Sequence, residues 1–159
     1  MYMEKFKRND GMILTKTGLK NAILYGLLSG LVLATFLKGV ELITHLTVYT
    51  LLLNVDYIPY INTFAFPELI EVGFHLLVSI ALAICLYLLF VHLKISSRKQ
   101  IIVTATTVCL IIGIALFPTT TFSDKTPDFR SFPSFSYWMA GHIIYGYILG
   151  YLLAKSKDN

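Results

Sequence analysis

Charged residues are scarce in this sequence. Only 14% of its 159 residues are charged, 56% are hydrophobic, and the mean hydropathy is +0.70. A soluble globular domain carries about 25% charged residues, so this composition excludes a soluble domain of this length. The chain is predicted to be an integral membrane protein.

Cysteine is nearly absent as well. Cys85 and Cys109 each stand alone in an apolar stretch, without CxxC spacing, which argues against a thiol–disulfide enzyme. The chain also lacks a Gly-rich nucleotide loop, a serine nucleophile motif and an acidic lipid-phosphatase signature. The sequence therefore indicates neither an enzyme nor a cofactor.

Long apolar stretches dominate what is present. A helix needs about 20 apolar residues to cross a hydrocarbon core of about 30 Å. Four windows meet or approach that length and predict helices over about 21–45, 69–92, 100–117 and 136–154. We expect an all-α fold: one integral membrane four-helix bundle over residues 1–159, in which a basic segment, 1–20, precedes the first helix.

Basic residues are distributed unevenly. Ten of the 13 Lys and Arg residues lie before the first helix, between the second and third, or after the fourth: Lys5, Lys7, Arg8, Lys16, Lys20, Lys94, Arg98, Lys99, Lys155 and Lys157. The positive-inside rule therefore predicts that both termini are cytoplasmic. The net charge of +4 is then a signal of topology, and the expected partner is the lipid bilayer, with no nucleic acid.

Ionisable residues gather toward the outer ends of three predicted helices. Lys38 lies 18 residues beyond Lys20, so a helical rise carries it about 27 Å further, to the outer boundary. Glu41 and His45 follow on the same helical face. Ionisable groups inside spans are rare and usually face the bundle interior. The predicted outer cluster comprises Lys38, Glu41, His45, Glu68, Glu71, His75 and His142.

Several members of this cluster also have an ordinary interpretation, and the sequence leaves both open. Lys38 could extend to the headgroups or pair with Glu41 or Glu71. Glu68 suits the first turn of a helix, where an exposed acid is favoured by the helix dipole. Glu41 and His45 could be residues of the outer interface.

Small residues form stripes on two of the predicted helices. Gly26 and Gly30 have GxxxG spacing, Ala34 continues their stripe, and Gly146 and Gly150 repeat the spacing in the last helix. Small residues let helix backbones approach closely in lipid. We expect these five residues on packing faces, which could also join copies of the chain in a homo-oligomer.

The segments "GLLSGLVLATFLKGVE", "EVGFHLLVSIALAICLYLLF" and "FSYWMAGHIIYGYILGYLL" suggest a family. Together they resemble the YagU-like bacterial inner-membrane proteins, over most of the chain from Gly26 to Leu153. Lys38 with Glu41, His75, and Gly141 followed by His142 carry the likeness. The connection between the first two helices is shorter here, so the long outer loop of that family is mostly missing.

A second resemblance stands beside the first. The chain is similar in length, and in its final "IYGYILGYLL", to YqhR-like four-helix membrane proteins of Firmicutes. The YagU-like resemblance implies a multi-pass protein of the bacterial cytoplasmic membrane, of unassigned biochemistry and with a loose link to acid resistance. It implies no particular reaction.

The cluster permits three functions of different classes. The first is a proton-responsive or ion-handling role, because paired Glu and His titrate between mildly acidic and neutral pH. The second is a divalent transition-metal site, such as zinc, whose candidate ligands are His45, His75, His142, Glu41 and Glu71. The third is a non-catalytic interaction or assembly protein joined through its glycine stripes. Lys38 nearby would oppose a bound cation.

Overall fold

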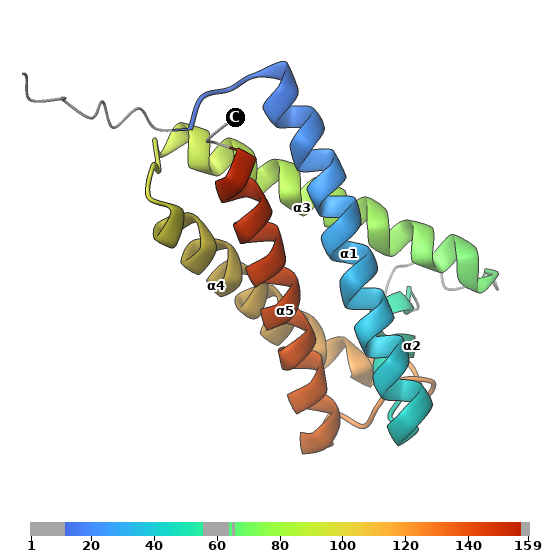
Figure 1. Cartoon of the computed structure of the whole chain (residues 1–159). Helices are drawn as coiled ribbons and strands as arrows, with labels where there is room; N and C mark the ends of the chain where they lie inside the picture. Colours follow the sequence, from blue (N-terminus) through green and yellow to red (C-terminus); the bar gives the residue numbers. More distant parts are fainter. Residues whose placement is uncertain (1–11, 56–63, 65, 157–159) are drawn as a thin grey trace, which may run out of the picture.

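The protein is described by a computed structural model that covers residues 12–55, 64 and 66–156 (Figure 1). Within these residues every regular element is helical, as the sequence predicts. The elements are α1 (Lys16–Thr44), α2 (Val48–Leu53), α3 (Glu68–His92), α4 (Arg98–Leu116), the 3-10 helix η2 (Phe117–Phe122) and α5 (Phe132–Ser156). Of the predicted basic segment 1–20, residues 1–11 lie outside the described residues.

Two long helices begin earlier than the apolar windows predict, because polar residues cap them. α1 starts at Lys16, where the hydroxyl of Thr15 accepts a hydrogen bond from the Gly18 amide at 2.8 Å. α5 starts at Phe132, and the hydroxyl of Ser131 accepts from the Ser134 amide at 3.4 Å. Side-chain oxygens at these positions satisfy amides that the helix itself leaves unpaired.

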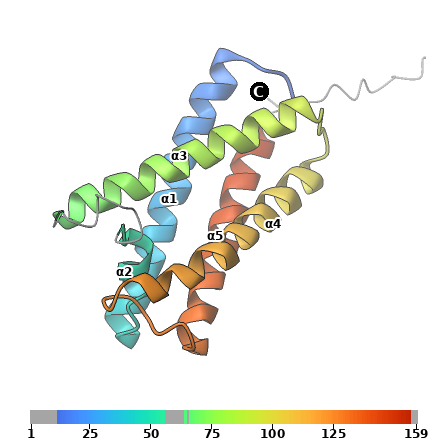
Figure 2. The same cartoon turned by 180° about the vertical axis from the view of Figure 1, so that it is seen from behind.

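The helices pack as antiparallel neighbours. α1 packs against α3 and α5, and α5 packs against α4 (Figure 1). Contact between α3 and α4 is slight along their described lengths. Figure 2 shows these two helices leaving their connecting loop and diverging toward α2, with α1 and α5 behind them.

The start of α1 and the end of α5 lie at one end of the molecule. Asn21 Nδ2 donates to Ser156 Oγ at 2.9 Å. At the same end the Tyr87 hydroxyl, from the last turns of α3, donates to the Ile13 carbonyl at 2.8 Å. The start of α1, the loop between α3 and α4 and the end of α5 meet here, and they carry most of the basic residues that the structure describes.

Glycines allow the closest helix contacts. A Cβ atom on Gly26 would lie 2.8 Å from Ile80 Cα in α3, and one on Gly146 would lie 2.7 Å from Thr106 Cα in α4. The structure buries the whole predicted set, Gly26, Gly30, Ala34, Gly146 and Gly150. Helices of the same chain pack against the glycines of both stripes, and a homo-oligomer joined through these faces stays a prediction.

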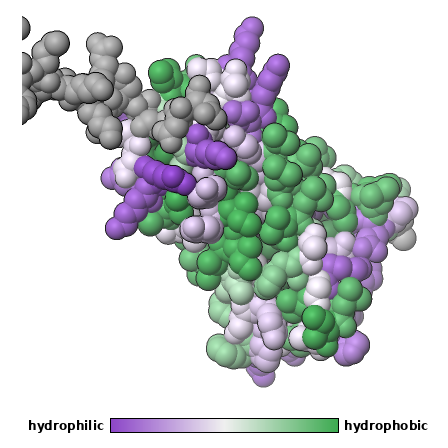
Figure 3. Space-filling model, in the orientation of Figure 1, coloured by the Kyte–Doolittle hydropathy of each residue, from purple (hydrophilic) through white to green (hydrophobic). Residues whose placement is uncertain are grey.

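Apolar side chains cover the middle of the molecule. Figure 3 shows a hydrophobic surface between hydrophilic patches near the start of α1 and near α2. Three segments of the described chain are long and apolar enough to cross a membrane: α1, α3 and residues 98–122. α5 is not one of them, because serine, tyrosine, glycine and histidine dilute its apolar residues. The apolar helices are consistent with a membrane protein.

Candidate functional site

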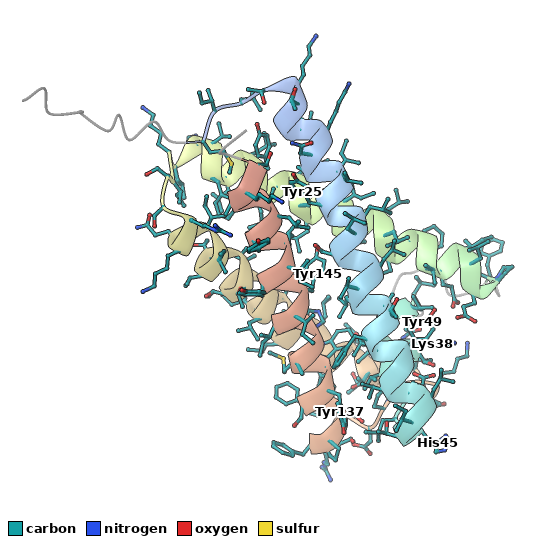
Figure 4. All side chains as sticks on the ribbon, in the orientation of Figure 1. Tyr25, Lys38, His45, Tyr49, Tyr137 and Tyr145 are labelled. Atoms are coloured by element: carbon teal, nitrogen blue, oxygen red, sulfur yellow. The ribbon has the colours of Figure 1, made fainter. Side chains whose placement is uncertain are left out.

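A polar network joins α1, α2 and α3 at the end of the molecule opposite the start of α1 and the end of α5. Lys38 Nζ lies 3.1 Å from Glu68 Oε1 and 4.4 Å from the centre of the Tyr49 ring (Figure 4). The Tyr49 hydroxyl donates to the same Glu68 oxygen at 2.8 Å. The side chain of Lys38 is 40% exposed and that of Glu68 is 59% exposed, so water weakens their attraction. The network chiefly positions α2 beside the start of α3.

Tyr49 is the buried member of this network. Burial raises its pKa well above the usual range, and the hydrogen bond to Glu68 raises it further. The hydroxyl therefore stays protonated at physiological pH and remains a donor to Glu68.

Glu41 has a structural role that the sequence did not reveal. Its Oε2 accepts hydrogen bonds from the amides of Tyr49 and Thr50, at 2.8 and 2.9 Å, and its Oε1 accepts from the Thr50 hydroxyl at 2.9 Å. A carboxylate at the first turn satisfies unpaired amides and interacts favourably with the helix dipole. Glu41 thus caps α2 from the last turns of α1.

His45 does not belong to the cluster. It ends α1 in the left-handed conformation, with φ of 59°, and its amide donates to the Glu41 carbonyl at 2.9 Å. Its side chain is exposed at the far end of α1 (Figure 4). The chain reverses here, which takes His45 off the helical face that the spacing argument assumed.

A cavity of about 300 Å³ lies where α3 and α4 diverge. Its floor comes from α1 and α5, and residues 51–55 cover its end nearest α2. Leu77 and Val78 also line it and are 63% and 65% exposed, so the cavity opens sideways between α3 and α4. The polar or aromatic side chains of its lining are Asn54, Glu71, Phe74, His75, Ser79, Thr119, Trp138, His142 and Tyr145.

The cavity brings His75 and His142 together from different helices. His75 Nε2 lies 3.1 Å from the Gly30 carbonyl of α1, and His142 Nδ1 lies 2.9 Å from the Trp138 carbonyl in its own helix. A carbonyl oxygen only accepts, so each of these ring nitrogens carries a hydrogen. In the neutral rings the other nitrogen of each, Nδ1 of His75 and Nε2 of His142, is an acceptor.

Packing fixes His142 more tightly than His75. The centres of the Trp138 and His142 rings lie 4.5 Å apart. Trp138 Nε1 also donates a hydrogen bond to the Gly113 carbonyl of α4 at 2.8 Å. A Cβ atom on Gly113 would lie 2.9 Å from His142 Cγ. His142 is 5% exposed, whereas His75 is half-buried.

One turn below His75, a hydroxyl pair joins α3 to α5. Ser79 Oγ donates to the Gly26 carbonyl at 2.7 Å and lies 2.9 Å from the Tyr145 hydroxyl. Both side chains are buried and both line the cavity. The polar wall of the cavity therefore continues from His75 through Ser79 to Tyr145.

The predicted metal ligands do not form a metal site. Among the described residues no group of three or more His, Cys, Asp and Glu side chains could hold a metal ion. His45 is exposed beyond the end of α1, and Glu41 is committed to the α2 amides. Only Glu71, His75 and His142 of the predicted set line the cavity, and the metal interpretation is set aside.

The sequence interpretation missed Tyr49, Trp138 and Tyr145 as members of the site. Aromatic residues are common at membrane interfaces, so nothing in their local pattern separates these three from the others. Ser79 did carry a usable signal, because it continues the helical face of Glu71 and His75.

Comparison with protein-family models, with curated proteins and with solved structures finds no match. The resemblance to YagU-like proteins, with YqhR-like proteins as the second candidate, stays a prediction.

Proposed function

We propose that this chain is a proton-responsive membrane protein whose sensing groups are His75 and His142. One observation carries the proposal: two histidines from different helices share a cavity within the apolar part of the molecule. Ionisable side chains at such depth are costly and are characteristic of functional sites. Histidine is the side chain whose ordinary pKa lies closest to physiological pH.

Protonation would change the cavity in a definite way. A protonated ring donates from both nitrogens, so each histidine would lose its acceptor and gain a charge that the surrounding leucines cannot solvate. The other titratable groups of the lining are Glu71 on α3, Cys109 on α4 and Tyr145 on α5. His142 has little room to move between Trp138 and Gly113, so its charging is expected to loosen the contact of α5 with α4.

The membrane setting is part of the same proposal. We infer four spans, in which α5 crosses beside α4, because its 25 residues extend about 37 Å and it packs against α4 and α1. The basic end would face the cytoplasm of a bacterial cell and the Lys38–Glu68 end would face outward. A link to acid resistance would follow if outside acidity reaches the cavity.

The single tryptophan provides the test. Trp138 is the only tryptophan in the chain and its ring contacts His142. A charged imidazole quenches indole emission, so acidifying the protein in liposomes from about pH 8 to about pH 4 should reduce its fluorescence, since this range extends well to either side of the ordinary histidine pKa. The change should disappear in His142→Gln and shift in midpoint in His75→Gln.

His45→Gln is the matched control, because His45 is exposed and does not line the cavity. The Trp138 fluorescence of this variant should change with pH as it does in the wild type. An emission that stays constant with pH in the wild type, or an unchanged response in His142→Gln, would contradict the proposal.

A further inference from the structure

The cavity is accessible from the surrounding bilayer. Leu77 and Val78 belong both to its lining and to the exposed surface of α3. In a spanning helix such a surface faces acyl chains. A molecule dissolved in the bilayer can therefore enter between α3 and α4 without crossing an aqueous face.

The inner wall is not suited to an acyl chain alone. His75 and His142 each keep one acceptor nitrogen, whereas the hydroxyls of Ser79 and Tyr145 are already hydrogen-bonded to each other and to the Gly26 carbonyl. Buried acceptors are costly unless a donor reaches them. An occupant that carries hydrogen-bond donors on an apolar chain would satisfy the wall and fill the remaining apolar space.

The charge of the lining narrows the class of occupant. Glu71 contributes a carboxylate, and the cavity lining includes no Lys or Arg. An anionic head would be repelled by this carboxylate and would face the lone pairs of the two histidine rings. The volume of about 300 Å³ is at the lower end for ligand pockets, and it holds about ten heavy atoms if each takes the space of one water.

We propose that the cavity between α3 and α4 binds a single-chain amphiphile from the bilayer, whose polar end donates hydrogen bonds and carries no negative charge. This inference rests on the proposed function in taking both histidines as neutral acceptors above neutral pH. The head is a hydroxyl or an ammonium group, which share this donor chemistry.

Four probes of equal chain length separate these possibilities: octanol, octylammonium, octanoate and octane. Each is added to the protein in nanodiscs at about pH 8, where an ordinary histidine is neutral, and retained molecules are counted by native mass spectrometry. One retained octanol or octylammonium, with octanoate and octane lost, supports the inference and identifies the head. Retention of octanoate equal to that of the donors, or retention of neither donor, overturns it.

Variants at the cavity mouth test its location. Val78→Trp, or Leu77→Trp as a second variant, should block entry and weaken retention about tenfold, which corresponds to about 1.4 kcal/mol. Ile111→Trp places the same side chain on α4, at a residue that is 59% exposed and outside the lining, and should bind like the wild type. Equal effects at Val78 and Ile111 would overturn the inference.

The proton response of Trp138 is measured without any added amphiphile, so the two proposals can fail separately. Selective retention without a pH response would reject the proton-responsive function. A pH response without selective retention would reject the amphiphile.

Discussion

His75 and His142 differ in what holds them, although both bond to a backbone carbonyl. His75 reaches across to Gly30 of α1, so its ring links two helices. His142 bonds within α5 and is confined by Trp138 and by Gly113 of α4. Protonation of His142 should therefore act on the α4–α5 contact, and protonation of His75 on the α1–α3 contact.

The fit of Gly113 against His142 gives a stability prediction. Gly113→Ala would place a methyl group 2.9 Å from His142 Cγ, and overpacking of this kind costs about 1–3 kcal/mol. Thermal unfolding in one detergent should show a lower Tm for this variant.

Gly39→Ala is the control for that variant. A Cβ atom on Gly39 would meet nothing within 4 Å, and alanine in a helix is favoured over glycine by about 1 kcal/mol. The Tm of Gly39→Ala should equal or exceed that of the wild type. A Gly113→Ala protein as stable as Gly39→Ala would show that His142 is not confined as described.

At the scale of elements, α2 depends on side chains from its neighbours. It has six residues, and a helix this short is not stable alone in water. Glu41 caps its first turn, and Tyr49 ties it to Glu68. Residues 51–55 line one end of the cavity. Unfolding of α2 would therefore open the cavity at that end.

Removal of the α2 cap should be visible in hydrogen exchange. Glu41→Ala takes the acceptor from the amides of Tyr49 and Thr50, and loss of a cap costs about 0.5–2 kcal/mol. Exchange at these two amides should accelerate, while the core of α3 stays protected.

Glu68→Ala serves as the comparison, because it removes the partner of the Tyr49 hydroxyl but no backbone acceptor of α2. The same two amides should exchange nearly as in the wild type. Equal acceleration in both variants would mean that the side-chain network, rather than the cap, holds α2.

Sequence patterns predict the long helices but not these connections. Windows of 18 residues with high mean hydropathy identify α1, α3, and α4 with the 3-10 helix that follows it. Three features were not predicted: the turn at His45, the cap by Glu41 and the short helix α2. They depend on contacts in space between residues whose polarity differs little from that of the residues beside them in the sequence. The stabilising energy of these contacts depends on distances and angles between atoms, and a hydropathy pattern gives no information about either.

At the scale of the whole molecule, the divergence of α3 and α4 decides which predicted residues meet. Helical spacing aligned Lys38, Glu41 and His45 along one helix, but it could not state which helices are adjacent. The structure separates the predicted cluster into an outer network around Lys38 and Glu68 and a deeper cavity with Glu71, His75 and His142. No local pattern in the sequence predicts that these residues divide into two groups.

Histidine-selective nitrogen-15 NMR of the protein in bilayers tests the central claim most directly. The four histidines can be assigned with single His→Gln variants. At about pH 8, where an ordinary histidine is neutral, we expect His75 to carry its hydrogen on Nε2 and His142 on Nδ1, and both rings to become imidazolium on acidification. A cavity histidine already charged at that pH, or two rings that remain neutral down to about pH 4, well below the ordinary histidine pKa, would contradict the account.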